Sequence, residues 1–287
     1  MPARSVITAR HERLGAELRK LRERAGLSGR EAARAAGIAE SKVSNMEVGR
    51  VGVSEERIRH LTGLYACDDA ALVDALVRMA TERGRGWWEE YRELLPAGFL
   101  DIAELEEHAA YLKTFESVHI PGLLQTEEHA RAICAFPVPE LRAEDIDKRV
   151  AFRLRRQEVL ARDDALPYTA VIHEAALRIR VADRKAAQRQ LLHILDQSER
   201  PQVAVHVIPF DLDGFAGIGY PMLYAGGAVP QLDTVLVETV HGSGFMDAEA
   251  QLHRYRGFLA KLEDAALGVV ESRDLIHQLI RQIGESR

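Results

Sequence analysis

The sequence is poor in cysteine and tryptophan and has no long apolar stretch. Its two cysteines, Cys67 and Cys134, fall in different predicted domains, which argues against a disulfide and favours the reducing cytoplasm. No apolar run approaches the length that crosses a bilayer and no apolar signal segment opens the chain, so we expect no membrane partner. Repeats and low-complexity tracts are also missing, and 287 residues leave room for two globular domains.

Short motifs of common enzymes are missing as well. The isolated histidines are His173, His193, His206, His241 and His253, and none has tight metal-ligand spacing such as H-E-x-x-H. The Gly242-Ser243-Gly244 segment lacks the G-x-S-x-G nucleophile elbow. Glycines 214, 217 and 219 do not make the dinucleotide fingerprint. We therefore expect no catalytic residue, no metal and no cofactor.

Residues Leu27 to Arg50, which read LSGREAARAAGIAESKVSNMEVGR, contain two short helix patterns that meet at a glycine. Ser28 and Glu31 fit a capping box at the start of the first helix. Gly37 supplies the positive φ that a tight turn requires. The second helix is expected from about Ala39 to Val48. This pattern is typical of a helix-turn-helix, whose second helix enters the major groove of DNA.

Helical spacing also continues on both sides of this pair. Leu14, Leu18 and Leu21 predict a helix before it, and Ser54 caps a later helix. With a last helix over residues 68–81, we expect five helices in about the first 80 residues. Residues 1–66 hold 13 Lys and Arg against 8 Asp and Glu, whereas the whole chain has a net charge of −6. A basic head on an acidic body is expected when one domain meets phosphate.

This head resembles regulators of the lambda-repressor-like, xenobiotic-response-element type, through LRKLRERAGLS, A-x-x-A-G-I and V-S-N-M-E-V-G. The resemblance implies that Glu40, Ser41 and Asn45 read bases and that Arg22 pairs with Glu47. The predicted DNA-binding residues are Glu40, Ser41, Lys42, Ser44, Asn45, Arg50 and Arg30. The usual glutamine after the first cap is Gly29 here, and the usual Ser or Thr cap of the recognition helix is Ala39. The alternative is a helix-turn-helix used only for protein contact.

A boundary is predicted at Gly84-Arg85-Gly86, which gives an all-α DNA-binding domain over 1–83 and a regulatory α+β domain over 84–287. In the second domain helices alternate with β-rich runs, typical of a mixed sheet with helices packed on it. We expect helices at 103–113, after Thr126, at 144–161 and at 184–197, and strands at 115–120, 168–173, 203–208, 222–224 and 234–240.

The second predicted domain contains five characteristic segments. In chain order they are HIPGLLQTEEHARAI (119–133), RLRRQEVL (153–160), VIHEAALRIRV (171–181), VAVHVIPF (203–210) and VLVE (235–238). Together they resemble the C-terminal domain of actinobacterial antitoxin-like (WhiJ-like) transcriptional regulators. The resemblance implies a small partner protein encoded nearby, and it supplies no ligand. From the residues themselves, Pro121-Gly122 is either a structural corner or part of a ligand site. The arginines at 153, 155 and 156 form either a solvated helix face or a site for an anion or acidic partner.

We expect a cytoplasmic, nucleoid-associated transcriptional regulator that binds a palindromic operator in double-stranded DNA as a homodimer. Two alternatives stay open: a regulator with a small-molecule effector pocket in its C-terminal domain and, less favoured, an enzyme with a tethered DNA-binding head. Trp87-Trp88 serves either as a core anchor or as an interface anchor, and the apolar C-terminal helix is either core or interface. Candidate partner or dimer residues are Trp87, Trp88, Leu123, Leu124, Leu275 and Ile276.

Overall fold

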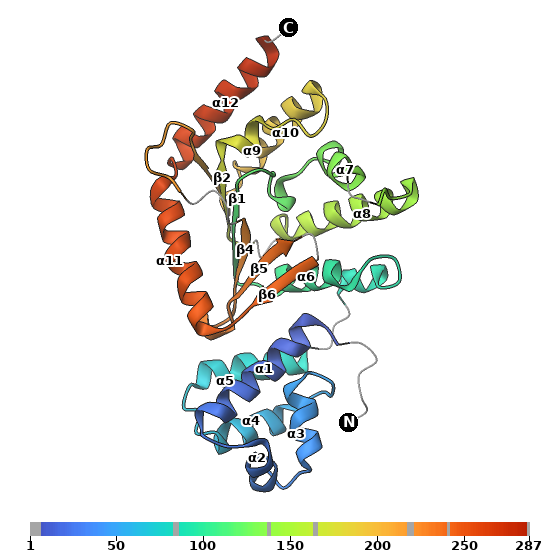
Figure 1. The fold of residues 1–287 in the computed structure, drawn as a ribbon, viewed down its shortest axis with the longest axis vertical. Helices are drawn as coiled ribbons and strands as arrows, with labels where there is room; N and C mark the ends of the chain where they lie inside the picture. Colours follow the sequence, from blue (N-terminus) through green and yellow to red (C-terminus); the bar gives the residue numbers. More distant parts are fainter. Residues whose placement is uncertain are drawn as a thin grey trace. The chain divides into compact units, whose positions relative to one another are not determined.

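The computed structural model describes residues 7–82, 86–136, 139–162, 166–216, 221–239 and 242–285 (Figure 1). These residues form two compact units. The helical unit holds the described residues up to Glu90 together with Ala97–Leu105 and Ala228–Leu232, and the sheet unit holds the rest. Of the predicted boundary at Gly84-Arg85-Gly86 only Gly86 is described, so a division after residue 83 stays a prediction.

Up to residue 82, the described part of the helical unit forms five helices, as predicted. They are α1 (Ala9–Arg24), α2 (Gly29–Ala35), α3 (Glu40–Glu47), α4 (Glu55–Leu64) and α5 (Ala70–Thr81). Thr8, Ser28, Ser54 and Asp69 each cap a helix by accepting a hydrogen bond from a backbone N–H three residues later. Leu18, Ile58 and Leu76 are buried at the centre of the core.

Two later segments complete the helical unit. Helix α6 (Ala97–Glu107) contributes Asp101, whose Oδ1 accepts a 3.0 Å hydrogen bond from the backbone N–H of Ala9. The connection over Ala228–Leu232 contributes Leu232, which is buried in the same core as α1 to α5. Its Gln231 side chain donates a hydrogen bond to Asp69, the residue that caps α5. The unit is therefore assembled from segments far apart in the sequence.

In the described part of the sheet unit, six strands form one sheet in the order β3-β2-β1-β4-β5-β6. They are β1 (Tyr111–Glu116), β2 (Tyr168–His173), β3 (Val203–Ile208), β4 (Met222–Gly226), β5 (Thr234–Thr239) and β6 (Gly242–Met246). The first three are parallel and the other pairings are antiparallel. In register, Phe115 lies opposite Val171 on β2 and Met222 on β4.

Helices cover both faces of this sheet. The helices of the unit are α7 (Glu127–Ala135), α8 (Ala143–Arg156), α9 (Glu174–Arg178), α10 (Arg184–Gln197), α11 (Glu249–Ala265) and α12 (Val269–Glu285). Helix α11 runs along one face and packs Leu252, Leu259 and Leu262 against Phe115 and Val235 (Figure 1). Helices α7 and α8 lie on the other side (Figure 1). The α+β class with a mixed sheet is confirmed.

Several predicted elements have different bounds. The helix expected at 103–113 is wrong at its C-terminal end, because α6 ends at Glu107 and Tyr111–Glu116 form β1, whose side chains alternate between two covered faces. The strand expected at 115–120 therefore shares only two residues with β1. The helix expected at 144–161 ends at Arg156 and tightens into a 3-10 turn over Gln157–Leu160. Val240, expected in a strand, lies outside the described residues.

No helix in the part of the chain that the structure describes combines the length and the apolar character needed to span a bilayer.

Candidate nucleic-acid interface

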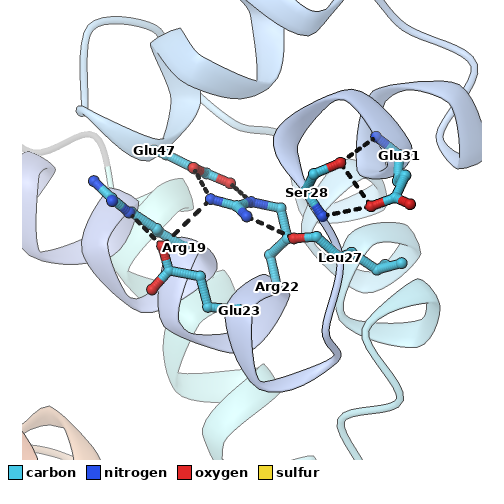
Figure 2. Close-up of polar contacts among 7 residues, drawn as sticks. All are labelled: Arg19, Arg22, Glu23, Leu27, Ser28, Glu31 and Glu47. Carbon is cyan, nitrogen blue, oxygen red and sulfur yellow. Dashed lines mark hydrogen bonds and ion pairs between the residues drawn. The ribbon is translucent and has the colours of Figure 1, made fainter.

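The start of α2 is fixed by a reciprocal pair of side-chain hydrogen bonds. The hydroxyl of Ser28 accepts a 3.2 Å bond from the backbone N–H of Glu31, and Glu31 Oε2 accepts a 2.8 Å bond from the backbone N–H of Ser28 (Figure 2). The Ser28 hydroxyl also donates to Glu31 and lowers the pKa of its carboxyl. Two N–H groups that the helix leaves free are thus satisfied.

A tight turn then directs the chain into α3. Gly37 adopts φ +64°, in the left-handed region that a Cβ disfavours, and the N–H of Ile38 donates to Ala33 O at 3.0 Å. Ala39 caps α3 without a side-chain hydrogen bond. The helix ends at Glu47, and Gly49, two residues later, adopts φ +72°. The turn geometry follows from glycine chemistry, whereas the start of α3 lacks the stabilisation that α2 has.

An ion pair fixes α3 against α1. Arg22 Nε donates to Glu47 Oε1 at 2.6 Å and Arg22 Nη2 donates to Glu47 Oε2 at 2.9 Å (Figure 2). Each side chain is only 10% exposed, and the hydrogen bond with Glu47 raises the pKa of Arg22. Arg22 Nη1 also donates to the carbonyl of Leu27 at 2.7 Å. One guanidinium therefore holds both the end of the candidate recognition helix and the turn before α2.

Two glycines allow α1 and α3 to approach closely. A Cβ on Gly15 would lie 2.5 Å from the carbonyl oxygen of Glu47, and one on Gly49 would lie 2.8 Å from the backbone of His11. Both distances are shorter than van der Waals contact. Sequence reasoning missed Gly15, although a glycine inside a strongly helical pattern is the available signal.

Of the predicted DNA-binding residues, those from Glu40 to Asn45 lie on α3, whereas Arg30 lies on α2 and Arg50 follows the end of α3. Val43 and Met46 are buried in the core. Asn45 is half-buried. The exposed residues of the predicted set are Glu40, Ser41, Lys42, Ser44, Arg50 and Arg30. The described part of α3 thus carries exposed hydroxyl, carboxylate and ammonium groups and a half-buried amide, which are chemical types that can hydrogen-bond base edges or phosphates.

The candidate partner and dimer residues lie mostly inside the units. Trp88, Leu123, Leu124 and Ile276 are buried. Trp87 and Leu275 are half-buried. This burial favours the structural reading of the tryptophan pair, the Pro121-Gly122 corner and α12.

The other charged candidates separate into different surroundings. Arg156 donates to both carboxylate oxygens of Glu106, at 2.8 and 2.5 Å, a pair that sequence reasoning missed because 50 residues separate the partners. Arg153 donates instead to the amide oxygen of Gln125. Among the described residues no three His, Cys, Asp or Glu side chains come together as metal ligands, and His241 lies outside those residues.

Two family models match this chain. One, described as a helix-turn-helix domain, matches residues 13–76, which include all of α2, α3 and α4. The other, described as a domain of unknown function (DUF5753), matches residues 99–278 and thus contains the whole sheet. No curated protein and no solved structure matches the chain.

Proposed function

Because the chain belongs to the family defined by the domain of unknown function DUF5753 and carries a helix-turn-helix domain, we propose that it regulates transcription by placing α3 in the major groove of DNA. The observation that carries this proposal is the bidentate Arg22–Glu47 pair. It holds one side of α3 in the core and leaves the side with Glu40, Ser41 and Ser44 in solvent. A helix that contacts bases in the major groove must be held rigidly on one side and be accessible to DNA on the other.

In this proposal Asn45 and Ser41 read base edges, and Glu40 accepts from a cytosine amino group. Lys42, Arg50 and Arg30 contact phosphates, and Ser44, which is exposed on α3, also belongs to the DNA-binding set. The basic excess of residues 1–66, 13 Lys and Arg against 8 Asp and Glu, supports the assignment to nucleic acid.

The test compares two alanine variants on an operator found by genome-wide footprinting. Asn45→Ala is expected to lose ~1–3 kcal/mol of binding free energy on the specific site and much less on random DNA. Arg50→Ala is expected to weaken both and to reduce the salt slope by about 1. Equal losses of Asn45→Ala on both DNAs would remove it from base reading. An unchanged salt slope would remove Arg50 from the phosphate contacts.

The resemblance to antitoxin-like regulators supports two finer proposals, a homodimer on a palindromic operator and a small partner protein encoded nearby. Two heads related by a twofold axis read half-sites about 34–36 Å apart. Sedimentation of the full chain with and without operator DNA tests the dimer. A chain that stays monomeric at micromolar concentration yet protects a palindrome as one unit would contradict it. Co-purification with the products of adjacent genes tests the partner.

Sensing of a small molecule is the second candidate function. It is favoured by charged side chains inside the sheet unit that do not form ion pairs. Arg153 and Glu116 are the main examples, since neither contacts an oppositely charged group among the described residues.

A further inference from the structure

The corner over residues 120–126 is held by three glutamine side chains. Gln125 Nε2 and Gln190 Nε2 each donate at 2.6 Å, and Gln157 Nε2 donates at 3.1 and 2.8 Å. The accepting carbonyl oxygens belong to Ile120, Leu124, Gly122 and Gln125. Gln190 Oε1 also accepts from the N–H of Thr126 at 2.8 Å. These hydrogen bonds fix the Gln125 side chain. Its amide oxygen, Oε1, takes no part in them and faces Arg153 on α8.

Gln125 Oε1 accepts a 2.8 Å hydrogen bond from Arg153 Nη1. Arg153 has no carboxylate within ion-pair distance among the described residues, whereas Arg156, one turn later on α8, has both oxygens of Glu106. Burial, and then the charge of Arg156, lowers the pKa of the Arg153 guanidinium. Enclosing a cation beside a neutral amide is costly. Glu238 and Glu106 offset this cost in part without pairing with Arg153, so an anion bound directly at the guanidinium would be favourable.

A carboxyl group lies near this guanidinium without pairing with it. Glu116 ends β1 and, because side chains alternate along a strand, it points away from the α11 face that Phe115 occupies. It makes no hydrogen bond or ion pair with any described group. Burial, and then the charge of Glu238 on β5, raises the pKa of Glu116 to about 8 against the opposing effect of Arg153. Near neutral pH Glu116 is therefore a hydrogen-bond donor.

A second donor is buried at the start of β2. Tyr168 is 1% exposed, and its hydroxyl has no hydrogen-bond partner among the described residues. The Thr114 side chain lies close to this hydroxyl, outside the geometry of a hydrogen bond. Burial raises the pKa of the Tyr168 hydroxyl, and the charges of Glu106, Glu116 and Arg156 also shift it. The hydroxyl therefore lies in the same polar interior as these groups. A buried polar atom left without a partner is uncommon in folded proteins, and a bound molecule that accepts from the Tyr168 hydroxyl would satisfy it.

We propose that Arg153, Glu116 and Tyr168 form a binding site for a small organic carboxylate, on the face of the sheet toward α8. The guanidinium supplies the charge, and the protonated carboxyl and the phenol donate to the same anion. Glu238 is exposed at the rim and repels a second negative charge, so the site favours a monoanion over a phosphate dianion. This inference deepens the sensing candidate and does not depend on DNA binding.

The test uses the full chain with acetate as the probe and chloride at equal ionic strength as the reference. Acetate is expected to raise the melting temperature, and Arg153→Gln is expected to weaken its binding about tenfold or more. Arg142→Gln, an exposed arginine at the start of the same helix, should bind acetate like the native chain. No stabilisation of the native chain by acetate, or equal stabilisation of the Arg153→Gln variant, would overturn the proposal.

Two further variants keep the test decisive if Arg153→Gln does not fold. Tyr168→Phe removes one hydroxyl and should weaken acetate binding about three- to tenfold. Binding should also weaken as pH rises through about 8, where Glu116 ionises beside Glu238, Tyr168 and Arg153. Glu116→Gln keeps a donor and should remove this pH dependence. An unchanged affinity in Tyr168→Phe, or tighter binding of inorganic phosphate than of acetate, would contradict the site as proposed. Since no DNA is present, failure here leaves the role of α3 untouched.

Discussion

Each of the two compact units holds an arginine away from most of the solvent, Arg22 buried and Arg153 half-buried, but their surroundings are opposite. In the helical unit Arg22 contacts both oxygens of Glu47 and a backbone carbonyl, so all three nitrogens of its guanidinium donate a hydrogen bond. In the sheet unit Arg153 contacts one amide oxygen. The first arrangement serves architecture, because it fixes where α3 lies. The second is typical of a ligand-binding site, because titratable groups with shifted pKa values and no ion-pair partner concentrate at functional positions.

The comparison is tested most directly by removing each charge. Arg22→Met is expected to lose ~3–5 kcal/mol of unfolding free energy, because Glu47 is left as an uncompensated buried charge. Arg153→Met should change stability by less than about 1 kcal/mol or increase it, because no carboxylate loses its partner. Urea unfolding followed by circular dichroism measures both.

A double-mutant cycle on Arg22 and Glu47 supplies the control for this result. Their coupling energy should account for most of the loss in Arg22→Met. If the two arginine variants lose the same free energy, or if the coupling is near zero, the contrast between the two units is wrong.

The close approach of α1 and α3 gives the next largest effect. Gly15→Ala would place a methyl 2.5 Å from Glu47 O, and we expect a loss of about 3 kcal/mol from the overpacked contact. Gly63→Ala is the matched control, since α4 has open space there and alanine should gain up to about 1 kcal/mol. Thermal unfolding of both variants decides. Equal tolerance of alanine at the two glycines would mean that the helices do not pack this closely.

The sheet unit should respond to acid through His129. Burial, then the charges of His119 and Arg153, lowers the pKa of His129 to about 4. Between about pH 6.5 and 4 this histidine binds a proton in the unfolded chain but not in the folded chain. The free energy of unfolding therefore falls as pH falls through this window. We expect this loss to be about 2 kcal/mol, allowing for partial solvent screening. His129→Gln should remove that part of the slope, and parallel slopes for the two proteins would contradict the assignment.

The smallest expected effect concerns the two caps of the helix-turn-helix. Ser28→Ala should lose about 1 kcal/mol with the capping box, whereas Ala39→Ser should gain up to about 1 kcal/mol by capping α3. Chemical denaturation of each variant resolves the two signs. A destabilising Ala39→Ser would indicate that the start of α3 has no room or geometry for a cap.

Local chemistry made much of this fold predictable. Asp183 before α10 and Pro209 after β3 mark the ends of elements, and α10, β2 and β3 span the predicted residues. The turn at Gly37 and the Ser28 cap follow from backbone conformation and from hydrogen bonds within three residues. These features depend on near neighbours, which a single sequence displays.

The parts that escaped prediction depend on distant neighbours. Strand β6 reads Gly-Ser-Gly-Phe-Met and becomes a strand by pairing with β5, not through its own propensity. The Glu106–Arg156 pair and the contact of Gln125 with Arg153 join residues 50 and 28 positions apart. Sequence reasoning recognised the arginines at 153, 155 and 156 as a cluster but could not tell which of them was neutralised. The location of α3 was readable, and the polar interior of the sheet unit was not.

The burial of Leu232 in the helical core has a consequence for how the chain is made. Leu232 packs with side chains of α1 to α5, all of which end by Thr81, so this contact spans about 150 residues of sequence. During synthesis the five helices leave the ribosome first and form their local contacts quickly. Their core lacks its last side chain until the β4–β5 connection has emerged. The nascent head therefore stays less stable than the finished one until most of the sheet has been translated.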